Sequence, residues 1–231
     1  FHGACMDSNS NIIVLGGATS LFQGATTYDS MEILRLGQPV ETLTWDDTVS
    51  AKMCKVRAGH ATIYDSSRNR IYAVGGYGGD EIYHNSLEWI DLSDERLTRD
   101  DGFVLCDQNM SVKRTGLGAS IGPDYSLYVI GGSPDGAHGH NSLERYDPRE
   151  GHWEPLEPMR VKRGYLSAVF SADGKLWVAG GSALVTTPNG QFNFEAYYDV
   201  IEVYDPRSNS WFQGGVLEEP LADLSLVSWT A

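Results

Sequence analysis

Two histidines stand one residue apart in a glycine-rich stretch, with a spacing that suits metal binding. His138 and His140 could hold a metal ion through their imidazole nitrogens, but a metal site needs further ligands and the sequence identifies none. The chain has three cysteines, without Cys-x-x-Cys or other ligand spacing. We therefore expect a solvated loop at the histidines, no metal or other cofactor, and reduced cysteines in a cytoplasmic domain, with secretion as the alternative.

The chain is strongly acidic. Its 231 residues include 31 Asp and Glu against 17 Lys and Arg, a formal net charge of −14. Nucleic acids and anionic membranes attract cationic proteins, so neither is an expected partner. No run of 18 apolar residues predicts a transmembrane helix. A basic or neutral protein partner is compatible with this charge.

The glycines follow a pattern of repetition. Four glycine pairs each close a short apolar run, and each is followed by an apolar-Glu dipeptide whose glutamates stand 56, 56 and 58 residues apart. A period near 50 to 60 residues with β-type runs is typical of propeller blades. The pairs are Gly16–Gly17, Gly75–Gly76, Gly131–Gly132 and Gly180–Gly181, and the glutamates are Glu32, Glu88, Glu144 and Glu202.

Each repeat is predicted to form four short strands, called a to d from the propeller axis outward. In the third repeat these are residues 117–121, 127–130, 142–146 and a strand that carries Trp153. The turns between strands are rich in Asp, Asn and Pro. The glycine pair suits a sharp turn at the end of strand b, where positive φ and close backbone approach are needed.

The third repeat resembles the kelch repeat. Residues 127–165 contain a glycine pair, then Asn-Ser-Leu-Glu-Arg-Tyr-Asp, a tryptophan, Pro-Met and an arginine, and the closest resemblance is to the propellers of kelch-like (BTB–kelch) ubiquitin-ligase adaptors. The resemblance covers nearly the whole chain, strongest in the third and fourth repeats. It implies an all-β kelch-type propeller.

The blade count is an open point. We expect one propeller over residues 1–231, with four-stranded blades at about 1–56, 57–115, 116–161 and 162–215 and an extra C-terminal strand at 221–231. Four blades and a spare strand do not close a simple ring. We therefore expect the chain to be part of a larger, six-bladed propeller, with a compact ring of four or five blades as the alternative.

The resemblance also implies where a partner would bind. In the adaptors the binding face is lined by residues after each glycine pair and by arginines that begin strand a, and an arginine fork suits a carboxylate or phosphate on a peptide. The longest loop, residues 182–199, adds aromatic side chains that either contact a partner or fold onto their own blade. The expected partner-binding residues are Arg57, Tyr77, Arg114, Ser133, Arg163, Tyr165, Phe192 and Phe194.

Three tryptophans stand late in their repeats. We expect Trp45, Trp153 and Trp211 to fill the wedges between blades, since a flat aromatic side chain buries a large area there. The arginines have an alternative role, in which each pairs with a nearby acid such as Asp80 or Glu81.

Function is predicted at the level of class. The primary hypothesis is a non-enzymatic module that presents one propeller face to a protein or peptide, and its finer form is the substrate receptor of a ubiquitin-ligase adaptor. The alternative is a kelch-fold copper-radical oxidase or another sugar-active enzyme, which Arg163–Tyr165 partly resembles. A cysteine is missing where such an enzyme would need one, because His2 stands there. A structural scaffold is a third hypothesis, and the sequence does not separate it from the first.

Overall fold

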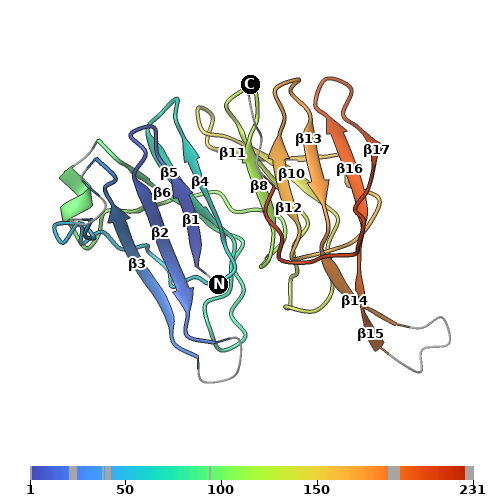
Figure 1. Ribbon diagram of the computed structural model, residues 1–231, viewed down its shortest axis with the longest axis horizontal. Coiled ribbons are helices and arrows are strands. Elements are labelled where there is room, and N and C mark those ends of the chain that lie inside the picture. Colours follow the sequence, from blue (N-terminus) through green and yellow to red (C-terminus); the bar gives the residue numbers. More distant parts are fainter. Residues whose placement is uncertain are drawn as a thin grey trace. The chain divides into compact units, whose positions relative to one another are not determined.

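The structure is a computed structural model of the chain, and it describes residues 2–20, 25–37, 39, 43–93, 95–186 and 193–226. This described part consists of antiparallel β-sheets and turns, with a short 3₁₀ helix and no α-helix, which confirms the all-β prediction. No helix in it is long and apolar enough to cross a membrane. The chain divides into two compact units, Phe1–Ser111 and Val112–Ala231, which are described separately (Figure 1).

The first unit holds two successive sheets, called blade 1 and blade 2. Blade 1 has three antiparallel strands in the order β1 (Gly3–Met6), β2 (Ile12–Ala18) and β3 (Thr27–Leu34). Blade 2 has four, in the order β4 (Ala61–Asp65), β5 (Arg70–Val74), β6 (Leu87–Asp91) and β7 (Val104–Leu105). The 3₁₀ helix η2 (Glu95–Thr98) lies before β7.

The second unit holds blades 3 and 4. Blade 3 runs in the order β8 (Gly118–Ile121), β9 (Leu127–Ile130), β10 (Leu143–Asp147) and β11 (His152–Leu156). Blade 4 runs in the order β12 (Ser167–Phe170), β13 (Leu176–Ala179), β16 (Val200–Asp205) and β17 (Ser210–Val216). A separate hairpin of β14 (Ser182–Thr186) and β15 (Asn193–Tyr197) projects beyond one end of blade 4 (Figure 1).

The four repeated glutamates occupy one register position. Each lies in the third strand of its blade and pairs with the third residue of the apolar run that precedes the glycine pair. The predicted repeat register is therefore confirmed. The pairs are Val14 with Glu32, Ala73 with Glu88, Val129 with Glu144 and Val178 with Glu202.

Short polar residues shape the turns between strands. The carboxylates of Asp65, Asp147 and Asp205 each accept a hydrogen bond from the backbone N–H two residues further on, at 2.9–3.0 Å. Asn69 and Asn209 have φ of 51° and 47°, in the left-handed region that asparagine tolerates. The polar stretches noted in the sequence are thus hairpin turns.

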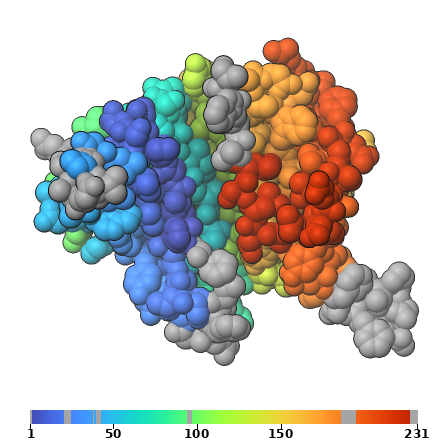
Figure 2. Space-filling view, viewed as in Figure 1, coloured from blue at the N-terminus to red at the C-terminus, as the bar shows by residue number. Residues whose placement is uncertain are grey.

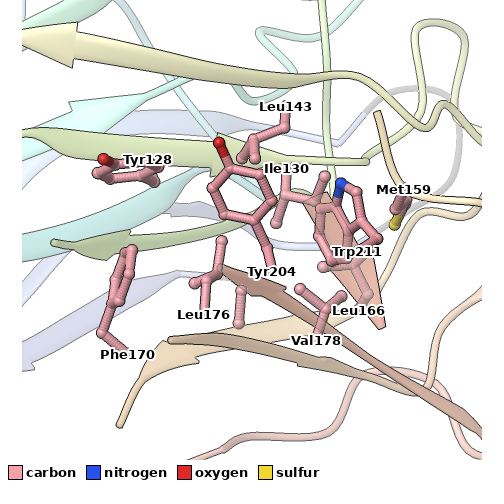
Figure 3. Close-up of a cluster of buried hydrophobic side chains, with 11 residues drawn as sticks. Tyr128, Ile130, Leu143, Met159, Leu166, Phe170, Leu176, Val178, Tyr204 and Trp211 are labelled. Carbon is pink, nitrogen blue, oxygen red and sulfur yellow. The ribbon is translucent and has the colours of Figure 1, made fainter. Parts of the chain in front are cut away.

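Each unit has an apolar core between its two blades. In the second unit, Tyr128, Ile130 and Leu143 of blade 3 pack with residues that include Tyr204 and Trp211 of blade 4 (Figure 3). Blades 1 and 2 share a similar cluster. Successive side chains of a strand point to opposite faces of the sheet. Each blade therefore has one face that can pack on the next blade and an opposite face that can pack on the preceding blade.

The three tryptophans are equivalent in register and differ in burial. Trp211 is 7% exposed in the core of the second unit, and its indole N–H donates to the carbonyl of Glu157, which follows blade 3, at 2.7 Å. Trp153 is half-buried and its ring lies 5.2 Å from that of Tyr146. The prediction is wrong for Trp45, which is 47% exposed.

The predicted C-terminal strand lies partly outside the described residues. Residues 221–226 are described and form no strand, yet they repeat the start of a blade. The N–H of Gly181 donates to the carbonyl of Leu221, just as that of Gly132 donates to the carbonyl of Arg163. In Figure 2 this red segment lies against the orange residues of blade 4. Membership of a larger six-bladed ring and the blade boundaries stay predictions.

Candidate partner-binding surface

The candidate surface lies at the end of each blade where the glycine pair turns the chain. Both glycines of all four pairs have positive φ, from 54° to 67° at the first and from 91° to 111° at the second. At Gly131 a Cβ atom would lie 2.7 Å from the carbonyl oxygen of Arg163. Glycine is therefore required by both the backbone conformation and the close approach of the next blade's first segment.

The residue after each glycine pair lies beside an arginine segment. Bridges join Ala58 to Tyr77, Thr115 to Ser133 and Gly164 to Ser182, and each of the first residues directly follows one of the three arginines. The expectation that each arginine and its glycine-pair loop share one end of a blade is confirmed for Arg57 with Tyr77 and for Arg114 with Ser133. For Arg163 the bridge from Gly164 to Ser182 places the start of the blade 4 loop at the same end of the blade. Phe192, which was expected in that loop, lies outside the described residues.

The arginine side chains do not reach the surface. Arg57 is fully buried, and its Nε donates to Glu88 Oε1 at 2.6 Å. The same guanidinium group donates to the backbone carbonyl of Gly75 and to the hydroxyl of Ser86 at 2.8 Å. Glu88 also accepts a hydrogen bond from the backbone N–H of Cys54, three residues before the arginine.

The second unit repeats this arrangement twice. Arg114 donates to the carbonyl of Gly131 at 3.0 Å and to Glu144 at 2.5 Å. Arg163 donates to the carbonyl of Gly180 at 2.8 Å and to Glu202 at 3.0 Å. We call each set an arginine–glutamate clamp, made of the arginine, the first glycine's carbonyl, the residue two before the glutamate, and the glutamate. The clamps are Arg57–Gly75–Ser86–Glu88, Arg114–Gly131–Ser142–Glu144 and Arg163–Gly180–Val200–Glu202.

The clamps correct the predicted role of the arginines. All three are 0% exposed, so Arg57, Arg114 and Arg163 cannot present a charged fork to a partner. Burial lowers the pKa of each guanidinium group, and the paired glutamate opposes this shift. A buried charge needs a counter-charge and hydrogen bonds, and the clamp supplies both. Each of repeats 2 to 4 has one arginine before its first strand and one glutamate in its third strand, and this one-to-one recurrence was the sequence signal for their pairing.

Half-buried aromatic side chains and exposed aliphatic and acidic ones gather at this end of blade 2. The rings of Tyr77 and Tyr83 lie 5.2 Å apart, and Ile82 between them in the loop is 53% exposed. Asp80 and Glu81 are exposed and have φ of 47° and 61°, which is uncommon for non-glycine residues. The loop thus holds an apolar side chain in water, beside two carboxylates.

The loop after the glycine pair of blade 3 is tied down by hydrogen bonds. Asp135 accepts from the backbone N–H groups of Ala137 and His138 at 3.0 and 2.8 Å, and its second oxygen lies 2.6 Å from His138 Nδ1. These hydrogen bonds, which outweigh the effect of burial, hold the pKa of Asp135 well below its usual range. Ser133 of the predicted site is only 1% exposed, so it offers little surface to a partner.

The loops of blades 3 and 4 meet. Tyr165 of the predicted site donates its hydroxyl hydrogen to the carbonyl of Gly136 at 2.9 Å, and the N–H of Leu184 in β14 donates to the carbonyl of Ala137 at 2.9 Å. Tyr197 at the end of β15 is 52% exposed. Phe194 lies in β15, but its side chain, like all of Phe192, is outside the described residues.

The histidine pair does not converge. His138 faces Asp135, whereas Nδ1 of His140 accepts a hydrogen bond from the backbone N–H of Ser142 at 3.1 Å. Within the described ranges, no three His, Cys, Asp or Glu side chains are grouped so that they could hold a metal ion.

Comparison with known proteins finds similarity to kelch-repeat proteins. The family model for the kelch motif matches residues 119–160, which span blade 3. A human protein named kelch repeat and BTB domain-containing protein 12 is 24% identical over 99% of this chain. β-Scruin of Limulus polyphemus is 39% identical over 38% of the chain. The matched region makes up 36% of the length of the human protein and 9% of the length of β-scruin.

The fold comparison agrees with the sequence comparison. The solved structure of YjhT superposes with a TM-score of 0.76 over 97% of this chain and 72% of its own, at 13% identity. At that identity the likeness concerns the fold alone. The family match falls on blade 3, whose strand order, glycine pair and clamp are repeated in blades 2 and 4. The chain therefore contains a kelch motif at blade 3 and is similar to kelch-repeat proteins.

Proposed function

We propose that this chain is a protein-interaction module that binds a protein or peptide through the glycine-pair end of its blades, without catalysing a reaction. The observation that carries the proposal is the blade 2 loop, where Ile82 is 53% exposed next to Tyr83, whose ring contacts that of Tyr77 in a tilted arrangement. Exposed aliphatic and aromatic groups on a rigid scaffold are typical of interface anchors. Of the predicted site residues, Tyr77 and Tyr165 remain in the proposed surface, with Phe192 and Phe194 as untested members.

The exposed charge of these loops points to a partner of opposite sign. Asp80 and Glu81 are exposed in blade 2, and Asp135, Glu195 and Asp199 are exposed in blades 3 and 4. The arginines that were expected to attract a carboxylate are buried. We therefore propose a partner segment with lysine or arginine around an apolar residue, and neither nucleic acid nor membrane as a ligand.

A finer proposal concerns the biological setting. The human relative carries a BTB domain by name and matches 99% of this chain, which supports a role as the substrate receptor of a BTB–kelch ubiquitin-ligase adaptor. We also propose a cytoplasmic location. The three cysteines form no disulfide, and burial raises the pKa of the Cys5 thiol to about 12, as suits a reduced, unreactive side chain.

The test uses matched surface variants. Ile82→Asp should weaken binding of a captured partner at least tenfold, because it removes an apolar contact and adds a charge. Met6→Asp is the control, since Met6 is 56% exposed and pairs with Ile12, at the end of blade 1 opposite its glycine pair. Equal binding by wild type and Ile82→Asp would contradict the proposed surface. Failure of the full-length protein to support ubiquitin transfer to that partner would contradict only the adaptor role.

A further inference from the structure

The segment that links blade 3 to blade 4 lies along the outer strands of blade 4 and leaves a hollow beside them. Residues 157–163 are fixed to blade 4 by hydrogen bonds: the carbonyl of Glu157 accepts from the indole N–H of Trp211 at 2.7 Å, and the N–H of Arg160 donates to Glu202 at 2.8 Å. Next to the second contact, a hollow of about 120 Å³ opens against β16 and β17. It is lined by Arg160, Val161, Val200, Glu202, Phe212 and Gln213.

The hollow involves the side of blade 4 that faces blade 3. Tyr204 and Trp211 are cross-strand neighbours, and both belong to the core shared with blade 3 (Figure 3). Glu202 and Gln213 are paired two residues further along the same strands, and side chains two residues apart in a strand share a face. Blade 3 belongs to the same described unit, so the hollow stays open with the neighbouring blade of that side in place.

A β-bulge shapes one wall of the hollow. Directly after the pair of Glu202 with Gln213, β17 has one extra residue, Gly214. A Cβ atom at Gly214 would lie 2.6 Å from Val203 Cγ2, so the bulge requires glycine there. The corresponding strands of blade 3, β10 and β11, pair without a shift. Bulges bend a strand and re-aim nearby side chains, and here the bulge adjoins Gln213 of the lining.

The exposed charge at the hollow is positive, on a strongly acidic chain. Arg160 is exposed, as is Lys162 two residues further on, and neither forms an ion pair within the part of the chain that the structure describes. The carboxylate at the base of the hollow is paired with its own clamp arginine. At the position of Arg160, three residues before the clamp arginine, blades 2 and 3 have Cys54 and Ser111. This free cation beside a hollow therefore sets blade 4 apart from blades 2 and 3.

We propose that the hollow is a second partner-binding site, which receives an aliphatic side chain of an extended partner segment with aspartate or glutamate directly beside it. The aliphatic group packs against Val161 and Val200, and the carboxylate accepts hydrogen bonds from the guanidinium group of Arg160, whose fork suits a carboxylate. The volume of about 120 Å³ suits a branched aliphatic side chain, since an apolar cavity of about 150 Å³ accommodates benzene. The site favours a partner charge opposite to that favoured by the Ile82 loop, and it does not rest on that loop.

The test is a titration of the full chain with a synthetic peptide, acetyl-Ser-Leu-Asp-Ser-amide, followed by the methyl signals of Val161 and Val200 in NMR spectra. Two altered peptides separate the two contacts. Alanine in place of the leucine removes the group that fills the hollow, and this peptide should bind about tenfold more weakly. Asparagine in place of the aspartate removes the charge, and this peptide should bind about threefold to tenfold more weakly.

Matched arginine variants test the protein side of the contact. Arg160→Gln keeps the backbone N–H that binds Glu202, so it should fold normally and bind the original peptide about threefold to tenfold more weakly. It should also stop distinguishing the aspartate peptide from the asparagine peptide. Arg207→Gln is the control, since Arg207 is an exposed arginine in the turn at the other end of β16 and β17, and it should bind as the wild type does.

Three results would overturn the proposal: valine methyl signals that do not shift at millimolar peptide, equal binding of the aspartate and asparagine peptides by the wild type, or equal loss of affinity in both arginine variants. Sodium isovalerate is titrated separately, and binding as tight as that of the peptide would overturn a peptide site in favour of a small-molecule site. Ile82→Asp should bind this peptide normally. A failure at the hollow therefore leaves the proposed glycine-pair surface standing, and the reverse also holds.

Discussion

His60 is a buried histidine that takes the place of a leucine in the other complete repeats. It follows Arg57 by three residues, as Leu117 and Leu166 follow their arginines. The His60 side chain is 7% exposed, and neither ring nitrogen has a hydrogen-bond partner within the described residues. Burial, followed by the nearby charge of Arg57, lowers its pKa from 6.5 to about 3.

This shift makes the protein sensitive to acid. The unfolded chain binds a proton at His60 below about pH 6.5, while the folded protein does not until about pH 3, so stability from this group is complete above pH 6.5 and is lost as the pH falls through that window. Between pH 7 and pH 5 the loss is about 2 kcal/mol, from about 1.4 kcal/mol per pKa unit over 1.5 units. His60→Leu should remove this dependence.

The assay compares urea unfolding midpoints of wild type and His60→Leu at pH 7 and pH 5. The stability difference between the two proteins should grow in favour of the variant by about 2 kcal/mol at the lower pH. His152→Gln, at an exposed histidine, should keep the acid sensitivity of the wild type. Parallel losses in wild type and His60→Leu would refute the reasoning, because the acid-sensitive group would then lie elsewhere.

Further predictions concern the clamps, the core, the glycine turn and metal content. Arg163→Ala should lower the free energy of unfolding by about 3–5 kcal/mol, since Glu202 is left buried without its partner, and Glu202→Leu with Arg163→Met should recover most of the loss in the same denaturation assay. Trp211→Ala should cost about 3–5 kcal/mol, while Trp45→Ala should change the unfolding midpoint little; similar losses would contradict the difference in burial. Gly131→Ala should cost more than about 1 kcal/mol, and a neutral effect would show that φ of 61° is not needed. Elemental analysis of purified protein should find no stoichiometric copper or iron, and finding either would favour the oxidase hypothesis.

The fold could be predicted because its signals are local and repeated. Four glycine pairs mark the ends of strand b, and the following glutamates mark strand c. Backbone conformation at a glycine pair is decided by neighbouring residues, so a short stretch of sequence carries the information. The division into two units was not predicted, since it depends on how many contacts each pair of blades shares.

The candidate site was harder to predict because burial depends on distant residues. Arg57 was expected to lie at a surface, or to pair with Asp80 or Glu81, but its partner Glu88 lies further along the chain and inside the blade. The sequence shows that an arginine and a glutamate recur once in each of repeats 2 to 4, but it does not show that the third strand brings the glutamate back to the buried arginine. The prediction that Trp45 is buried was wrong for the same reason. Its bridge to Leu34 has the expected register, but burial of its ring depends on residues outside its own blade.

The contact between successive blades within each unit has a consequence for how such a chain can grow. The second glycine of blade 1 donates to the carbonyl of Arg57, that of blade 3 to Arg163, and that of blade 4 to Leu221. The junction is thus the same wherever it occurs, and at Leu221 it forms without an arginine. Because blades 1, 3 and 4 each present the same backbone junction to the segment that follows, duplicating such a blade in register creates no new kind of interface. Tandem gene duplication could therefore lengthen this architecture one blade at a time, with the clamp arginines gained or lost afterwards.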